Sequence, residues 1–438
     1  MLNLRFSLLT ILILLPISAY SQQFNNSVGG QYASQVNAAV ARDQSETSIF
    51  TNPAGLANFK GNSISSGASS YGLLRVEDES NGNSYTALSS SSNHVALVIA
   101  GSKYNYGFMI YNFSTTKQFE SKNVSTKNSE DYLRYNDSIT TQDGDAHLYS
   151  FALARKNSKQ GFNFNLINFD NRSQVSTSGY EYSQATPGSR RNFNTSTIVQ
   201  LKLLAASVNY GFQGKFSQNF KWGLKLTSPA FILQNNSHVN VNMLYITPNG
   251  ANDNYILNIR QDSEYTISDN KFNNGDLIFG LAYLKSNIDY ELDFLITPAS
   301  KSIYLKQKSS PFSSTWNSST DTNTSQTTFD DSNTRVNSKA TIETRLGAQY
   351  RVDDKNTYGL GFSYTPTKDL DDKGVNTATL TIGTTKSYKN FIGNYALHYM
   401  RGFDAGNNEV TDSEGNNTED INISYEQYSL IFGGSYQF

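Results

Sequence analysis

The sequence contains no cysteine, and this absence excludes several kinds of site at once. Structural disulfides, thiolate metal sites and cysteine nucleophiles cannot form, and neither can a lipid-modified N-terminal cysteine of the bacterial kind. Charged residues are also scarce, at 16% of 438 residues, and they balance to a net charge of −2. A nucleic-acid-binding protein needs an excess of basic residues, so we expect no nucleic-acid partner.

Long apolar runs are absent except at the N-terminus. There, Arg5 precedes the run FSLLTILILL, Pro16 ends it, and the small residues Ala19 and Ser21 precede a plausible cleavage point before Gln22. This pattern predicts a cleaved secretory signal peptide over residues 1–21. No other stretch approaches the roughly 20 apolar residues that a spanning helix needs. The mature chain is therefore expected to be exported and to cross any membrane as strands.

Residues of alternating character recur along most of the chain. In TIETRLGAQYRV, Ile342, Leu346 and Tyr350 share one face, whereas Glu343 and Arg345 lie on the other. The last strand, ending LIFGGSYQF, alternates in the same way and places an aromatic residue at its end. Charged residues opposite a continuous apolar face are typical of a wall between lipid and a polar interior.

Short and long polar spacers alternate along the sequence. The long ones cover roughly 76–92, 115–145, 171–195, 235–270, 306–337 and 403–420, with a shorter one at 367–374, and 235–270 could hold another hairpin. Numbered from about residue 62, the strands come to fourteen. Even strand numbers with short turns on one side and long loops on the other indicate an outer-membrane barrel. The alternative is a soluble β-sandwich or solenoid, but no repeat of 20–50 residues is visible.

Residues 22–61 do not alternate and precede the barrel, which is predicted to cover 62–438. The stretch YASQVNAAVARD would place Tyr32, Val36, Ala39 and Val40 on one side of a short helix. Barrels of about eight strands fill themselves, whereas those of 16–18 enclose an aqueous channel. A fourteen-stranded barrel therefore has room for this segment, and we expect residues 22–61 to form a plug in the lumen.

The motif IFTNPAGLANF lies within this predicted plug. Asn52 is a favourable helix N-cap, and Pro53 suits the first helical position. The motif therefore predicts a short helical turn, whose free amides would favour a carboxylate. The alternative interpretation is a tight turn that only wedges the plug against the wall.

TNPAGLA, about thirty residues after the predicted cleavage point and followed by a barrel, resembles the plug motif of the FadL-type transporters of hydrophobic compounds, which include long-chain fatty acid transporters. The hairpin VNYGFQGKFSQNFKWGLKLTSPAF and the C-terminal LIFGGSYQF are also similar to that family. The resemblance implies a fourteen-stranded antiparallel transmembrane barrel blocked by an N-terminal hatch. In that family a hydrophobic molecule enters at the external loops, passes into a pocket beside the hatch and can leave sideways into the membrane. Asn52, Pro53 and Ala54 match the hatch motif, and we expect them, with Phe50 and Gly55, to contact the ligand.

Two arginines, Arg345 and Arg351, share the predicted inner face with Glu343. Mutual neutralisation inside a wet lumen is one interpretation, and an electrostatic hold on a ligand carboxylate is the other. We expect no cofactor, because no cysteine is present and the four histidines, His94, His147, His238 and His398, have no metal-ligand spacing. We expect no enzymatic activity either, because the abundance of serine makes any serine–histidine pairing uninformative.

Two functions remain open. The first is an outer-membrane channel for passive uptake of fatty-acid-like or aromatic small molecules. The second is a barrel of the same fold that binds other proteins as a scaffold or secretion shuttle. Expected partners are a hydrophobic small-molecule ligand, outer-membrane lipid and the barrel assembly machinery, which would bind the aromatic C-terminus at Phe438.

Overall fold

The computed structural model describes residues 32–78, 83–88, 91–127, 132–183, 190–248, 254–267, 271–273, 275–317, 322–327, 331–366, 375–404, 409–411, 417–420 and 423–438. The predicted signal peptide, residues 22–31 of the predicted plug and the predicted spacer at 367–374 lie outside these residues. Within the described part, no helix has the length and apolarity needed to cross a membrane.

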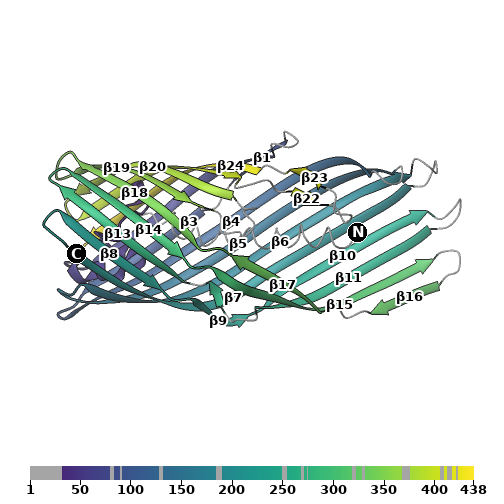
Figure 1. Ribbon diagram of the computed structural model, residues 1–438, viewed down its shortest axis with the longest axis horizontal. Helices are drawn as coiled ribbons and strands as arrows, with labels where there is room; N and C mark the ends of the chain where they lie inside the picture. Colours follow the sequence, from purple (N-terminus) through teal and green to yellow (C-terminus); the bar gives the residue numbers. More distant parts are fainter. Residues whose placement is uncertain are drawn as a thin grey trace.

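Fourteen antiparallel strands form a closed transmembrane barrel, as predicted. The ring closes because the first strand pairs with the last, with Ser63 opposite Gln437. Figure 1 shows the strands running obliquely along the barrel, with the short turns and the C-terminus at one end. In ring order the strands are β1 (Ser63–Asp78), β3 (Ser91–Ala100), β4 (Tyr104–Lys127), β5 (Tyr132–Arg155), β6 (Gln160–Ser183), β7 (Arg190–Lys215), β8 (Phe220–Thr227), β13 (Asp276–Lys285), β14 (Ile288–Thr297), β18 (Thr341–Arg351), β19 (Asn356–Thr365), β20 (Val375–Tyr388), β21 (Phe391–Asp404) and β24 (Ile423–Gln437).

Most of the segments predicted to be long loops are strands, and they extend the barrel wall beyond the apolar belt. The prediction of loops was therefore wrong for these segments. The pairing of β4 with β5 continues without a break to Lys127 and Tyr132, and 235–270 contains the hairpin that the sequence left open. Asn, Ser and Thr gave these segments a loop-like composition, but their backbone groups are satisfied by neighbouring strands. The additional strands are β2 (Asn83–Leu88), β9 (Ala230–Asn235), β10 (Ser237–Pro248), β11 (Asn254–Ile267), β12 (Lys271–Asn273), β15 (Ser300–Asn317), β16 (Thr322–Thr327), β17 (Asp331–Ser338), β22 (Glu409–Thr411) and β23 (Asn417–Asp420).

The two faces of the wall follow the predicted alternation. On β18, Ile342 is 55% exposed on the outside, whereas Glu343 and Arg345 are each 4% exposed on the inside. Phe438 lies on the outer face and is 62% exposed, and its backbone pairs with Asn62. The apolar belt ends partway along the long strands, because Lys202 on the outside of β7 already forms an exposed ion pair with Asp170.

Residues 32–61 lie inside the barrel, where nearly every side chain is buried. This luminal segment contains two 3₁₀ turns, η1 (Ala33–Gln35) and η2 (Pro53–Asn58), and one helical turn, α2 (Ser48–Thr51). η1 contacts β18 to β21, and η2 contacts β4 to β7. The segment therefore spans the lumen from one wall to the other.

The predicted amphipathic helix through Tyr32, Val36, Ala39 and Val40 does not form. Only the turn of η1 is present, because Val36 and Asn37 adopt left-handed conformations with φ of 48° and 56°. All four predicted face residues are buried. The wall surrounds the segment on every side, so no single apolar face is required.

Candidate functional site

Asn52 joins the luminal segment to the wall. Its Oδ1 accepts a hydrogen bond from the Ala54 amide at 3.1 Å, and its backbone is extended, with φ −161° and ψ 106°. The predicted N-cap with Pro53 at the first helical position is thus confirmed. Its Nδ2 donates to the Val40 carbonyl at 2.8 Å and to the Phe212 carbonyl of β7 at 2.9 Å. One buried amide therefore fixes the turn, the segment and the barrel together.

The amides of this turn are not available to a carboxylate. The Ala54 amide donates to the Asn52 side chain, the Gly55 amide donates to the Asn52 carbonyl, and Pro53 has no amide hydrogen. Both Pro53 and Ala54 are buried. The contacts favour the interpretation of a turn that wedges the segment against the wall.

Two wall glycines permit this close approach. A Cβ on Gly211 would lie 2.0 Å from Asn52 Oδ1, and one on Gly161 would lie 2.2 Å from the Pro53 carbonyl oxygen. Real Cβ atoms do not approach so closely, so any larger residue at either position would displace the segment. Gly161 of β6 and Gly211 of β7 thus form the part of the wall against which the turn Asn52–Ala54 packs.

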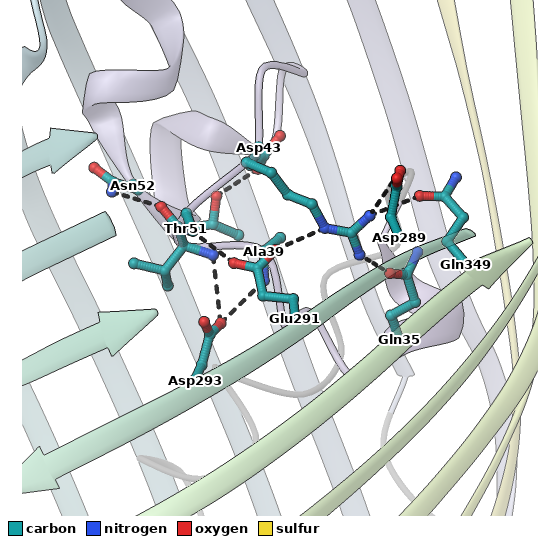
Figure 2. A network of polar contacts seen from close by, with 12 residues as sticks. Gln35, Ala39, Asp43, Thr51, Asn52, Asp289, Glu291, Asp293 and Gln349 are labelled. Atoms are coloured by element: carbon teal, nitrogen blue, oxygen red, sulfur yellow. Dashed lines mark hydrogen bonds and ion pairs between the residues drawn. The ribbon is translucent and has the colours of Figure 1, made fainter. Parts of the chain in front are cut away.

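Arg42 anchors the segment at a second point, through contacts with Glu291, Asp289 and Gln349, which Figure 2 labels. Its Nε donates to Glu291 Oε2 at 2.6 Å, and its Nη1 donates to Gln349 Oε1 at 2.9 Å. Nη1 also lies 3.6 Å from Asp289 Oδ2, and the guanidinium stands 5.0 Å from the centroid of the Tyr32 ring. This arginine is buried, so it is a charge removed from water and compensated by wall carboxylates.

The wall carboxylates come from alternate positions of β14, which all face the lumen. Glu291 Oε1 accepts from the Ala41 amide at 2.6 Å, and Asp293 Oδ2 accepts from the Ala39 and Val40 amides at 3.0 and 3.3 Å. These backbone amides would be satisfied internally in a helix. The carboxylates of β14 thus supply the hydrogen-bond acceptors that backbone carbonyls would have supplied in the predicted helix.

A second acidic centre lies within the segment itself. Asp43 accepts from the Ser45 amide at 2.8 Å, from the Thr47 hydroxyl at 3.0 Å and from the Thr51 hydroxyl. Burial raises the pKa of Asp43 above its usual value, although these hydrogen bonds oppose the shift. Burial also raises the pKa of Glu46 to about 7, and the Asp43 charge adds to the effect. Glu46 accepts a hydrogen bond from Ser63 of β1, so it forms another contact between segment and wall.

The two predicted arginines lie on β18, and both are paired with carboxylates. Arg345 Nε donates to Glu343 Oε1 at 2.6 Å, and the buried Nη2 of Arg345 has no hydrogen-bond partner among the described residues. Arg351 Nη2 lies 2.7 Å from Asp289 Oδ1, with its side chain 47% exposed near the short turns. Neutralisation therefore accounts for Arg351, whereas Arg345 keeps one buried donor.

Phe50 is half-buried beside Lys225 of β8. The ammonium of Lys225 donates to the Phe50 carbonyl at 2.9 Å and lies 4.9 Å from the centroid of its ring. Gly55 lies deeper, where a Cβ would come 2.1 Å from the Asp43 carbonyl oxygen. The candidate residues thus form a group at Phe50–Gly55 and a separate pair on β18.

An apolar surface lines the lumen along β3 to β7. Its buried members pack in one cluster with Ile49 and Leu56 of the luminal segment, and Phe50 packs against it. The wall residues of this cluster are Ala96, Val98, Met109, Tyr111, Ala146, Leu148, Ala152, Ala154, Phe169, Leu201 and Leu203. Barrel interiors are usually polar, and the β14–β18 side of this lumen is. The lumen lining therefore contains a largely apolar region along β3 to β7, interspersed with buried polar side chains such as Ser150 and Asn165, and a charged region on β14 and β18. These regions are called the apolar half and the charged half below.

The four histidines do not converge. His94 and His398 are buried with no hydrogen-bond partner on either ring nitrogen, whereas His147 contacts Asn112 at 2.8 Å. Among the described residues, no group of three or more His, Asp or Glu side chains could hold a metal ion.

The sequence analysis missed Arg42, Glu291 and Asp293. The alternation of charged residues in IDYELDF was a signal that these carboxylates share one face. Nothing in the sequence connected that face with Arg42, which lies 249 positions from Glu291.

Comparison with known proteins gives a uniform result at the level of fold. No family model and no curated protein matches the chain. Among solved structures, a mutant of the TodX monoaromatic hydrocarbon channel aligns with TM-score 0.58 at 12% identity, covering 95% of this chain and 98% of that one. A Pseudomonas aeruginosa FadL homologue aligns with TM-score 0.57 at 11% identity, and the CymD monoaromatic hydrocarbon channel with TM-score 0.52 at 13% identity; both cover 94% of this chain and 98% of theirs. The resemblance to FadL-type proteins is thus confirmed in the fold: this chain is a transmembrane barrel built on the architecture of the FadL-type hydrocarbon channels.

Proposed function

We propose that this protein is an outer-membrane channel for the passive uptake of hydrophobic small molecules. The apolar half of the lumen is the observation that carries the proposal. Solved structures with the same fold are described as channels for monoaromatic hydrocarbons, which supports the same chemical class for this chain.

The apolar half provides the driving force for entry. Each methylene that leaves water for an apolar surface gains about 0.8 kcal/mol. In this proposal a hydrophobic compound would be buried against Met109, Phe169 and Leu203 once they are uncovered, because each is at most 2% exposed in the docked state. Phe50 lies at the end of this surface that meets the luminal segment, where the compound would first contact the segment.

The luminal segment acts as the plug in this proposal, within the expected division into signal peptide (1–21), plug (22–61) and barrel (62–438). Asn52, Pro53, Ala54 and Gly55 hold the plug against the wall beside the apolar surface. Arg345 faces the same lumen, and its free Nη2 suits the head group of a fatty-acid-like ligand. Arg351 has a structural role in its pair with Asp289.

Uptake measurements on matched lumen variants test the proposal. Leu203→Asn places an amide on the apolar surface, whereas Thr379→Asn changes a buried luminal position on β20, away from that surface. Uptake of labelled toluene and of labelled laurate is measured in cells that depend on this protein, with each variant's barrel assembly checked by heat-modifiable gel mobility. We expect Leu203→Asn to lower uptake at least tenfold and Thr379→Asn to change it less than twofold. Equal uptake by both variants would show that the apolar surface is not the route.

The protein-binding scaffold has one observation in its favour. The segment packs against the wall so closely that a Cβ on Gly161 or Gly211 would overlap it, and a permanently sealed lumen would suit a scaffold. Native mass spectrometry of the gently extracted protein separates the two functions. A co-purifying small hydrophobic species supports the channel, whereas an empty barrel with a stoichiometric protein partner supports the scaffold.

A further inference from the structure

Lysine occurs at every short turn of the barrel. The six turns that join β3–β4, β5–β6, β7–β8, β13–β14, β18–β19 and β20–β21 contain or adjoin Lys103, Lys156, Lys215, Lys285, Lys355 and Lys389. Five of these side chains are exposed and Lys156 is partly exposed. Figure 1 shows that the short turns lie together at one end of the barrel. The lysines carried by these turns are therefore distributed around that end, and we call them the lysine ring.

Acidic side chains in the described residues offset this ring at one turn only. In the described residues, the acidic side chains at this end are Asp353 and Asp354 in one turn, together with Asp289. Asp353 accepts hydrogen bonds from the Lys355 and Asn356 amides, and Asp289 is paired with Arg351 and Arg42. The whole chain carries 35 basic and 37 acidic residues, so the excess of lysine here is a local property of the short-turn end.

Aromatic side chains fix the depth of the ring in the membrane. Tyr388 is 66% exposed and Phe216 is 70% exposed, both on the outside beside the turns. Aromatic residues at such positions lie at the level of the lipid head groups. The Lys103 ammonium lies 5.5 Å from the Tyr104 ring centroid, and the Lys389 ammonium lies 5.6 Å from that of Tyr388. The ammonium groups are therefore held at the level where lipid phosphates lie.

We propose that this lysine ring binds anionic phospholipids of the leaflet that surrounds the short-turn end. A zwitterionic phospholipid brings its own ammonium group next to the lysines, whereas an anionic one brings only negative charge. A lysine near an anionic membrane surface strengthens binding about fivefold. The effect on each side chain is modest, but a ring with one lysine per turn acts on lipids all around the barrel.

The full-length protein in detergent micelles provides the test. The micelles contain equal amounts of phosphatidylglycerol and phosphatidylcholine, and native mass spectrometry counts the retained molecules of each lipid. We expect the unchanged protein to retain phosphatidylglycerol preferentially, and this preference to decline as the salt concentration rises. In the variant with Gln at all six positions (103, 156, 215, 285, 355 and 389), the preference should fall about fivefold, whereas the variant with Arg at the same six positions should keep it.

The matched control is Arg172→Gln/Lys202→Gln, which removes two exposed cations from the outer face of β6 and β7, above the apolar belt. This control should change the preference less than twofold. Equal retention of both lipids by the unchanged protein would overturn the proposal. A preference that survives in the variant with Gln at all six positions, or that falls equally in the control, would also overturn it.

Discussion

Removal of the Arg42 guanidinium is expected to release the luminal segment from the wall. In Arg42→Met, the buried Glu291 carboxylate loses its ion pair, although it keeps the Ala41 amide. Breaking a buried pair by removing one partner costs about 3–5 kcal/mol. The cost applies to the docked state, because Glu291 gains water when the segment moves away. The equilibrium constant for release should therefore rise about 150- to 5,000-fold.

A single cysteine can report this release, because the chain has none of its own. Ala39 is fully buried in the segment, so a hydrophilic maleimide labels Ala39→Cys only after release. Adding Arg42→Met to this reporter should raise the labelling rate by at least two orders of magnitude. Adding Arg351→Gln instead should raise it no more than about fivefold, since that arginine is half-exposed and its pair is worth about 1 kcal/mol or less. A labelling rate within twofold of the reporter alone in Arg42→Met would refute the reasoning.

Two further perturbations use the same reporter. The pKa of Glu46 is about 7 in the docked segment and near 4.5 once the side chain is exposed. The contribution of protonated Glu46 to docking is therefore complete below about pH 4.5 and is lost as the pH rises through 7. The labelling rate should increase over this pH range, and Glu46→Gln should remove the part of the increase that depends on Glu46. Gly211→Ala places a Cβ 2.0 Å from Asn52 Oδ1 and should increase the labelling rate at least tenfold. The control is Gly393→Ala, whose Cβ meets nothing closer than 3.3 Å, and it should leave the labelling rate unchanged. Equal labelling rates for the two glycine variants would contradict the close docking at Asn52.

The parts of the structure that the sequence predicted are those with a local signal. Alternation in 341–352 assigns Ile342 to the lipid and Glu343 to the lumen because a strand has a period of two residues. Asn52 followed by Pro53 defines a capped turn from adjacent residues alone. In contrast, the Arg42–Glu291 pair depends on how the barrel closes, which no local pattern encodes. The strands that continue beyond the apolar belt were mistaken for loops because they are rich in Asn and Ser, which are typical of turns.

In the channel proposed above, the division of the lumen would let the barrel hold the segment and still offer a route past it. The charged contacts of Arg42 with β14 are directional and are lost together when the segment moves, so they define one docked position. The apolar surface along β3 to β7 has no such directionality, because the gain on burial depends on area rather than on geometry. Ile49 and Leu56 of the segment occupy part of that surface in the docked state, and their carbonyls also accept hydrogen bonds from the buried amides of Asn163 and Asn105. In the proposed channel, a hydrophobic compound that replaced these side chains would gain apolar burial but would have to leave the two backbone contacts in place.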